Sequence, residues 1–302
     1  MSAPGKQVEL GIVQMRCEAD IDRNLARAQE LTREAAARGA KLVCLPELFR
    51  SRYFCQTEDA ALFDLAETIP GPSSRAFCAL AAELDITVII SVFERRTAGL
   101  YHNTALVIDG KLGLTGTYRK MHIPDDPRFY EKFYFAPGDL GFKAFDTAAC
   151  RIGTLVCWDQ WYPEAARITA LQGAQVLFYP TAIGWHPAER DALGQSQYAA
   201  WEVIQRSHAV ANGCFVAAVN RTGFEPDPSA PSEGIQFWGQ SFVAGPDGQI
   251  LCQAGVDEET VLSVTLDLAR IEEQRRGWPF LRDRRIDAYA GLTARFLDQA
   301  DE

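Results

Sequence analysis

The chain has 302 residues, of which 47% are hydrophobic and 23% are charged. Such a composition excludes a globally disordered protein, and the length suffices for a core without disulfide bonds. The net charge of -10 is opposite to that of a protein that binds phosphate backbones, so we expect no nucleic-acid partner. No apolar run approaches a membrane span and residues 1–6 lack an export signal, so we expect a cytoplasmic protein.

The spacing of cysteine and histidine gives no sign of a metal site. The eight cysteines are scattered singly, and the four histidines do not have the spacing of ligands. Zinc ribbons and redox dithiols need such spacing, so we expect no metal and no cofactor. Most of the cysteines fit small buried thiols in a reducing compartment.

The first half of the chain opens with a β-α-β unit. Residues 8–15 predict a strand, and apolar residues then recur at helical spacing from Ile21 to Ala35, between Asp20 as N-cap and Gly39 as stop. Residues 41–45 predict the second strand. The segments expected next are a helix over 73–84 and strands over 86–93, 101–108 and 112–118, with a hairpin turn at Asp109-Gly110.

A similar unit opens the second half, with a strand over 151–156, a helix over 163–171 and a strand over 175–179. The two units end alike, in Gly-Ala-Lys-Leu-Val-Cys-Leu-Pro and Gly-Ala-Gln-Val-Leu-Phe-Tyr-Pro. This similarity indicates a weak internal duplication, which would place Glu47 and Thr181 at equivalent strand ends beside one crevice. The segments expected after it are a helix over 191–211 and strands over 214–220, 236–244 and 261–266.

No linker or charge block divides the chain, and the proline-rich stretch at 226–231 is typical of a surface loop. We therefore expect one α/β domain over residues 1–302. Its tail, residues 278–302, includes Trp278, Phe280 and Phe296 and is too apolar to lie free in solvent. We expect the tail to dock on the body or on a neighbouring subunit, and the protein to be a homo-oligomer.

Three polar residues each close a strand-like run. Cys157 precedes a turn and a helix that begins at Pro163, a strand-to-helix elbow that suits a nucleophile. Glu47 follows a buried strand, where a carboxylate suits a base. The charge of Lys120 would stabilise an oxyanion and lower the pKa of a neighbouring thiol. Taken singly, each has an ordinary alternative, namely a buried cysteine, a helix-capping glutamate and a surface lysine.

The order Glu47, Lys120, Cys157 resembles the carbon–nitrogen hydrolase (nitrilase) superfamily, whose members use a Glu-Lys-Cys triad. The resemblance extends from Gly-Ile-Val-Gln at 11–14 to Ser-Phe-Val-Ala-Gly-Pro-Asp-Gly at 241–248. It implies a four-layer α-β-β-α sandwich whose subunits pair through helices and C-terminal tails. Within the superfamily, Cys-Trp-Asp-Gln-Trp-Tyr-Pro-Glu at 157–164 and Arg-Lys-Met-His-Ile-Pro-Asp-Asp-Pro at 119–127 resemble the N-carbamoylputrescine amidases.

This resemblance implies a role for each residue. Cys157 would attack the ureido carbon of a carbamoylated amine, and Glu47 would carry the protons. Lys120 and the backbone N–H of Trp158 would stabilise the oxyanion, while Glu131 matches a second glutamate that holds the lysine. A carbamoyl thioester would form, and the products would be putrescine, carbon dioxide and ammonia, a step of polyamine synthesis.

Substrate charge separates the remaining alternatives. An ammonium group calls for carboxylates or aromatic faces, whereas a carbamoyl amino acid calls for an arginine. Residues beside the motifs suit the ammonium: Asp125, Asp126, Tyr130, Trp158 and Trp185. The alternatives are a hydrolase of N-carbamoyl-β-alanine, another carbamoyl amino acid or an aliphatic amide, an acyltransferase on the same fold, and a non-catalytic binding protein.

Overall fold

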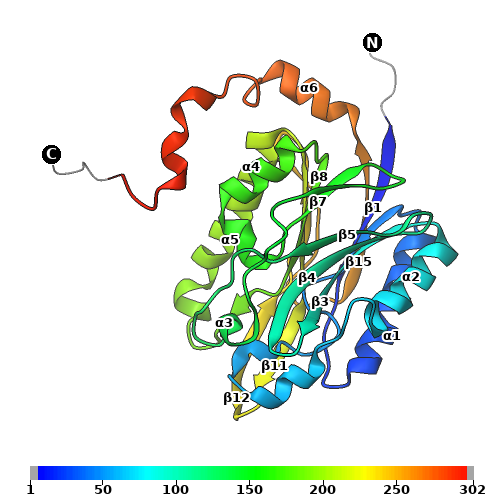
Figure 1. Cartoon of the computed structure of the whole chain (residues 1–302), viewed down its shortest axis with the longest axis vertical. Coiled ribbons are helices and arrows are strands. Elements are labelled where there is room, and N and C mark those ends of the chain that lie inside the picture. Colours follow the sequence, from blue (N-terminus) through cyan, green and yellow to red (C-terminus); the bar gives the residue numbers. More distant parts are fainter. Residues whose placement is uncertain (1–5, 298–302) are drawn as a thin grey trace.

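The computed structural model describes residues 6–297, and its centre is a pair of six-stranded sheets (Figure 1). The first sheet has the order β15-β1-β2-β3-β4-β5. Strands β1, β2 and β3 are parallel, and the other neighbours are antiparallel. The bounds are β1 Gln7–Gln14, β2 Leu42–Cys44, β3 Thr87–Thr97, β4 Leu100–Asp109, β5 Gly113–Arg119 and β15 Thr260–Asp267.

The second sheet has the order β14-β13-β10-β8-β7-β6 and repeats the strand directions of the first. Strands β7, β8 and β10 are parallel, with antiparallel strands on both sides. The bounds are β6 Ala144–Asp146, β7 Arg151–Thr154, β8 Val176–Thr181, β10 Phe215–Asn220, β13 Phe242–Ala244 and β14 Ile250–Gln253. This shared topology agrees with the predicted duplication.

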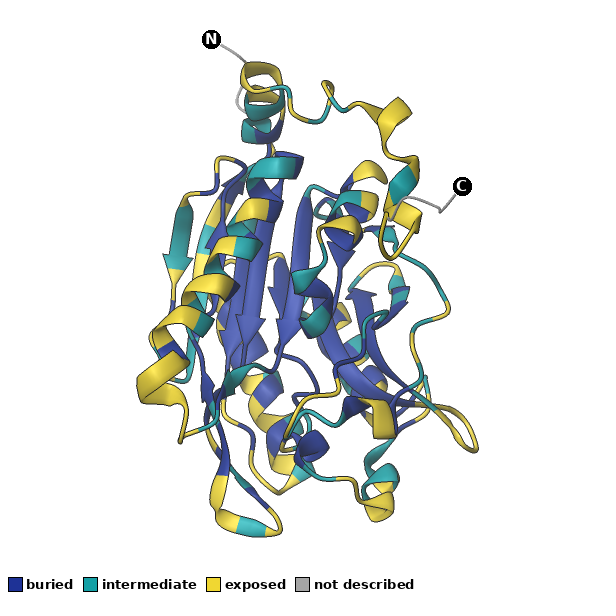
Figure 2. Cartoon of the chain, turned by 90° about the vertical axis from the view of Figure 1, so that its left-hand side faces the viewer, coloured by how far each residue is buried: buried dark blue, intermediate teal, exposed yellow. Residues whose placement is uncertain are grey.

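Helices cover the outer face of each sheet and complete four layers. Helices α1 (Ile21–Ala37) and α2 (Pro72–Leu84) contact the first sheet, and α4 (Pro163–Leu171) and α5 (Arg190–Asn212) contact the second. The strands are buried between helices whose outer faces are exposed (Figure 2). The four-layer sandwich that the resemblance implies is therefore confirmed.

The alternation of side chains along β2 shows why two apolar layers form. Leu42 and Cys44 lie in the core between the two sheets, whereas Val43 and Leu45 lie in the core beneath α1 and α2. Successive side chains of a strand point to opposite faces, so a continuous apolar run is buried on both. Asp20 caps α1 as predicted, because its side chain accepts hydrogen bonds from the backbone N–H groups of Asp22 and Arg23.

A third sheet, of order β11-β12-β9, closes one end of the sandwich. The single strand predicted over 236–244 is wrong: β12 ends at Trp238, and β13, in another sheet, begins at Phe242. Gly239 and Gln240 break it, with positive φ values of 57° and 53°. The loop predicted over 226–231 is shorter than expected, because 226–227 end β11, 230–231 begin β12, and only 228–229 form the turn between them. The remaining bounds are β9 Gly184–Trp185, β11 Thr222–Asp227, β12 Ala230–Trp238, α3 Glu131–Tyr134 and the 3-10 segments η1 Phe54–Gln56, η2 Ala60–Leu65, η3 Cys157–Trp161, η4 Ile286–Ala288 and η5 Ala290–Thr293.

The tail follows α6 (Ala269–Gly277) and extends outward from the sandwich (Figure 1). Its large apolar side chains are mostly exposed, for example Trp278 at 64% and Ile286 at 74%. The body of the chain therefore does not cover these side chains, contrary to one of the two expected arrangements of the tail. Docking of the tail on a neighbouring subunit stays a prediction. Residues 298–302 of the predicted tail lie outside the described residues. Within residues 6–297, no helix is both long and apolar enough to cross a membrane.

Candidate active site

Four ionisable side chains form a buried cluster at one edge of the two main sheets. Glu47 follows β2, Lys120 follows β5, Glu131 opens α3, and Cys157 follows β7. The side chains of Glu47, Lys120 and Glu131 are fully buried, and Cys157 is 5% exposed. Because the carboxyl ends of parallel strands meet at one edge, residues far apart in the sequence come together here.

Lys120 lies between the two carboxylates. Its Nζ donates to Glu47 Oε1 at 2.8 Å and to Glu131 Oε2 at 2.6 Å. Asn103 donates to Glu47 Oε1 at 2.7 Å, and the Tyr53 hydroxyl donates to Glu131 Oε1 at 2.6 Å. Glu47 Oε2 accepts no hydrogen bond from the described residues, so this oxygen has the capacity to take a proton.

The charges of the cluster set its protonation. Burial alone would lower the pKa of Lys120, but the carboxylates of Glu131 and Glu47 outweigh it and raise that pKa well above its usual value. Burial raises the pKa of Glu131 to about 7, opposed by Lys120. Burial and then Glu47 raise the pKa of the Cys157 thiol, and the predicted lowering by Lys120 does not compensate. The resting thiol is therefore protonated, and attack requires a base.

A strained elbow presents Cys157. Its φ is 43°, and it begins the 3-10 segment η3 rather than α4 itself. Asp159, fully buried, accepts from Val156 N at 2.9 Å and Tyr118 OH at 2.7 Å, and from His122 N at 3.0 Å and His122 Nδ1 at 2.7 Å. These bonds tie the elbow to the segment that carries Lys120, so nucleophile and lysine share one support.

A pocket of about 410 Å³ opens onto the cluster. Three buried polar atoms of its lining residues have no partner within residues 6–297, namely Trp161 Nε1, Trp238 Nε1 and Gln197 Oε1. The lining residues therefore retain two donors and one acceptor that the described residues do not satisfy. The lining residues are Pro124, Asp126, Pro127, Phe129, Glu131, Cys157, Trp158, Trp161, Ala182, Ile183, Gly184, His186, Glu189, Gln197, Ala200 and Trp238.

Comparison with known proteins agrees with this geometry. The family model of the carbon-nitrogen hydrolases matches residues 9–276. The chain belongs to the carbon–nitrogen hydrolase (nitrilase) superfamily. This hydrolase is 42% identical to an N-carbamoylputrescine amidase of Solanum lycopersicum over 294 residues, 97% of each chain. It is 36% identical to a citrullinase of Francisella tularensis, over 96% of this chain and 99% of that one.

A solved structure is also close to the hydrolase. The crystal structure of a carbon-nitrogen hydrolase from Helicobacter pylori G27 superposes with a TM-score of 0.93 at 46% identity. The match covers 96% of this chain and 100% of that chain. The superfamily and the fold predicted from the sequence are thereby confirmed.

Some of the predicted substrate-binding residues line the pocket, and others do not. Trp158 lines the pocket of the hydrolase, whereas Asp125, Tyr130 and Trp185 do not. Asp125 is exposed, and the Trp185 indole donates to Gly194 O at 3.1 Å behind the pocket. Trp185 also packs on the pocket residue Trp238, with ring centres 5.3 Å apart.

Besides Glu131, two further carboxylates line the pocket of the hydrolase. Asp126, the neighbour of Asp125, is one, and Glu189 is the other. Glu189 is not distinguished by the sequence, because it lies in a polar stretch before a helix, where glutamate is common. The one feature of the sequence that could have indicated it is its position shortly after β8. That strand ends at Thr181, whose carbonyl oxygen accepts a hydrogen bond from Glu47 N. Among the residues that the structure describes, no lysine or arginine lines this pocket.

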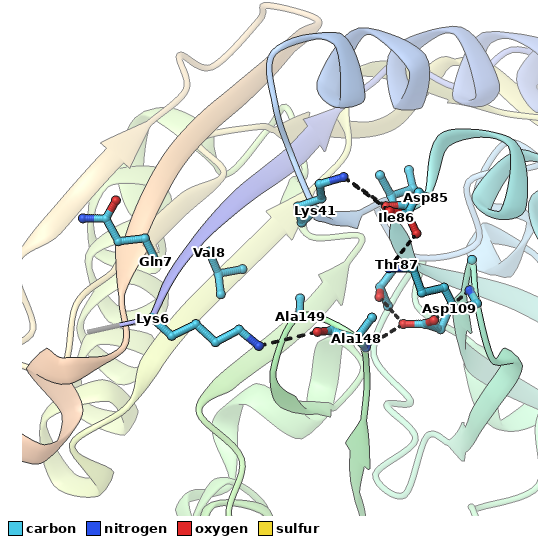
Figure 3. Close-up of a pocket in the computed structure, with 12 residues that line it drawn as sticks. Lys6, Gln7, Val8, Lys41, Asp85, Ile86, Thr87, Asp109, Ala148 and Ala149 are labelled. Atoms are coloured by element: carbon cyan, nitrogen blue, oxygen red, sulfur yellow. Dashed lines mark hydrogen bonds and ion pairs between the residues drawn. The ribbon is translucent and has the colours of Figure 1, made fainter. Parts of the chain in front are cut away.

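A smaller pocket of about 230 Å³ lies at the opposite end of the first sheet, where β1, β2 and β3 begin (Figure 3). Lys41 lies 3.8 Å and Lys111 3.3 Å from Asp85 carboxylate oxygens. The Asp109 carboxylate accepts from Thr87 at 2.7 Å and from Ala148 N at 2.8 Å. Among the described residues, no cysteine lines this pocket.

Proposed function

We propose that this hydrolase cleaves N-carbamoylputrescine to putrescine, carbon dioxide and ammonia. The observation that carries the proposal is the charge of the pocket beside Cys157: Asp126 and Glu189 line it in addition to Glu131, and no lysine or arginine among residues 6–297 does. Carboxylates bind a substrate ammonium through charge-assisted hydrogen bonds. The identity to named N-carbamoylputrescine amidases, 42% over nearly the whole chain, supports the same substrate.

The first half of the proposed reaction forms a carbamoyl enzyme. Glu47 takes the proton of the Cys157 thiol, and the sulfur attacks the ureido carbon. Lys120, with the backbone N–H of Trp158, stabilises the negative oxygen of the tetrahedral intermediate. The carbon–nitrogen bond to the terminal amide nitrogen then breaks, and Glu47 returns the proton so that ammonia leaves. A carbamoyl thioester remains on Cys157.

The second half releases the amine. Glu47 takes a proton from water, and the hydroxide attacks the thioester carbon. The carbon–sulfur bond breaks and the thiol regains its proton. The released carbamic acid decomposes to carbon dioxide and putrescine. Glu131 holds Lys120 throughout, which the bond of 2.6 Å between Glu131 Oε2 and Lys120 Nζ supports.

The alternative functions differ from the proposed one in the charge of the substrate or in the molecule that finally accepts the carbamoyl group. Citrulline and N-carbamoyl-β-alanine carry the same ureido group, and the 36% identity to a citrullinase supports ureido chemistry in general. Both also carry a carboxylate, for which the pocket offers no cationic side chain. An acyltransferase would transfer the carbamoyl group to an added amine, so product analysis with and without hydroxylamine distinguishes it from a hydrolase.

The test is ammonia release from four ureas that carry different charged groups. N-carbamoylputrescine is compared with N-pentylurea, in which a methyl group replaces the ammonium, and with citrulline and N-carbamoyl-β-alanine. We expect kcat/KM for the putrescine compound to exceed that for pentylurea about tenfold to a hundredfold, the worth of a charged hydrogen bond. Faster release from citrulline or from the β-alanine compound contradicts the substrate.

Two variants identify the ammonium site. Asp126→Asn and Glu189→Gln keep size and remove charge, so each should lower kcat/KM for N-carbamoylputrescine and leave that for pentylurea unchanged. Asp125→Asn is the matched control, because Asp125 is exposed and does not line the pocket. Equal losses on both ureas would show that the carboxylates do not recognise the ammonium.

A further inference from the structure

Arg221 is a fully buried cation at the junction between β10 and β11. Its guanidinium carbon lies 5.2 Å from the ring centre of Phe237 and 5.9 Å from that of Tyr53. It does not line the substrate pocket. A buried charge destabilises a protein unless it is well paired and hydrogen-bonded, so the partners of Arg221 indicate its role.

Those partners include the backbone of the segment that carries Glu47. Arg221 Nη2 donates to the carbonyl oxygen of Glu47 at 2.6 Å and to that of Leu48 at 2.9 Å. Its Nη1 donates to the carbonyl oxygen of Ser51 at 3.2 Å. Leu48 has a φ of 48°, a left-handed conformation that surrounding structure must enforce in a leucine. One guanidinium thus holds three carbonyl groups of a strained turn.

A second chain of bonds leads from Arg221 to Glu131. Arg221 Nη1 donates to Glu225 Oε1 at 2.8 Å, and Glu225 Oε2 accepts from the backbone N–H of Tyr53 at 2.6 Å. The Tyr53 hydroxyl donates to Glu131 Oε1 at 2.6 Å. Arg221 is therefore connected to both carboxylates that bind Lys120.

We propose that Arg221 is a positioning residue of the reaction, which fixes the turn after β2 so that the Glu47 carboxylate reaches Lys120 and the Cys157 thiol. This inference rests on the proposed role of Glu47 as the base. No residue of 47–53 lines the substrate pocket. Loss of Arg221 should therefore lower kcat and leave KM nearly unchanged.

Two variants test this in different ways. Arg221→Lys keeps the charge but not the planar fork that serves several carbonyl groups at once. Arg221→Gln/Glu225→Gln removes both charges and so leaves no unpaired buried ion. We expect kcat for N-carbamoylputrescine to fall about a hundredfold in both, the cost of misplacing a reacting group by about 1 Å, with KM within about threefold.

The matched control is Arg206→Gln/Glu202→Gln. Arg206 also bonds a glutamate four residues away, Glu202 at 2.9 Å, and a backbone carbonyl, that of Gly248 at 2.8 Å. Neither residue of this pair lines the pocket, so the control should lose stability without losing kcat. Thermal melts of all variants show whether activity merely follows stability.

A second readout needs no substrate. The rate at which iodoacetamide alkylates Cys157, followed by peptide mass spectrometry, reports how well Glu47 removes the thiol proton. We expect the rate to fall about tenfold or more in Glu47→Gln and in both Arg221 variants. No fall in Glu47→Gln would overturn the proposed base. A fall there, with kcat and alkylation within about threefold of the parent in the folded Arg221 variants, would overturn the role of Arg221 alone.

Discussion

At the scale of single residues, Lys120 organises the site by binding two carboxylates at once. Glu47 and Glu131 both lie within hydrogen-bond distance of its Nζ, and all three side chains are fully buried. The ammonium stays charged because its carboxylate partners outweigh burial and raise its pKa. The Cys157 thiol, whose pKa is raised by burial, stays protonated beside it. In the resting site, the proton that the base must remove is therefore on the sulfur of Cys157.

This protonation predicts the behaviour of Cys157→Ser. A serine hydroxyl is a far weaker acid than a thiol, so the carboxylate proposed to deprotonate Cys157 would not deprotonate serine to a useful extent. We expect ammonia release to fall to the level of the blank, with a melting temperature within a few degrees of the parent. Cys214→Ser, at a buried cysteine outside the cluster, is the control and should retain turnover. Normal turnover by Cys157→Ser would contradict the mechanism.

The raised pKa of Glu131, about 7, predicts an acid limb of the pH–rate profile. Below about pH 7 the protonated carboxyl no longer holds Lys120, so the rate should fall as the pH falls. Glu131→Gln should lower kcat about a hundredfold. It should also remove the acid limb near pH 7, because glutamine does not titrate. An acid limb that stays in place would remove Glu131 from the titration.

At the scale of elements, two equivalent β-α-β units contribute different residues to the candidate active site. Gly11 pairs with Val43 in the first sheet, and Gly153 pairs with Leu177 in the second. Glu47 and Thr181 each lie four residues beyond the second partner, and Glu47 N donates to Thr181 O at 3.4 Å. One unit thus contributes Glu47 after its second strand, and the other contributes Cys157 after its first.

Close packing of helix on strand predicts the effect of a methyl group at Gly153. A Cβ there would lie 2.2 Å from Thr169 Cγ2 and 3.0 Å from Leu177 Cδ2. Gly153→Ala should therefore lower the free energy of unfolding by about 1–3 kcal/mol, measured by urea denaturation. Adding Thr169→Ser removes the clashing methyl group and should recover much of the loss. Gly277→Ala, where a Cβ would meet nothing within 4 Å, is the control.

At the scale of the whole molecule, a single copy of the chain does not explain why the apolar tail is exposed. Large apolar side chains of the described tail are exposed, among them Ile286, Leu292 and Phe296 at 74%, 64% and 79%. A soluble monomer rarely exposes a large contiguous apolar patch. We propose that the tail packs against a second copy of this chain and that the protein is a homo-oligomer.

Removing residues 278–302 tests that proposal. Light scattering coupled to size-exclusion chromatography should give a multiple of the 33.4 kDa chain mass for the full protein and a smaller mass for the truncated one. The matched control is Phe280→Ser alone, which leaves the rest of the tail and should weaken assembly less. A full-length chain that stays monomeric at micromolar concentration contradicts the proposal.

The sequence by itself determined the local features of this protein. Hydrophobic periodicity located both β-α-β units, including the helix at 163–171 with its observed bounds, because buried strands and amphipathic helices leave period-specific patterns. It also showed that Glu47, Lys120 and Cys157 each follow a strand, and parallel strands bring their carboxyl ends to one edge.

Only the tertiary structure decided which distant residues support that edge. Arg221 is 174 residues from Glu47, so no local sequence pattern connects the two. Glu189, instead of Asp125, lines the pocket, and the strand predicted over 236–244 divides between two sheets. Local periodicity fixes whether a segment is a strand or a helix. Which side chains meet depends on packing between elements far apart in the chain.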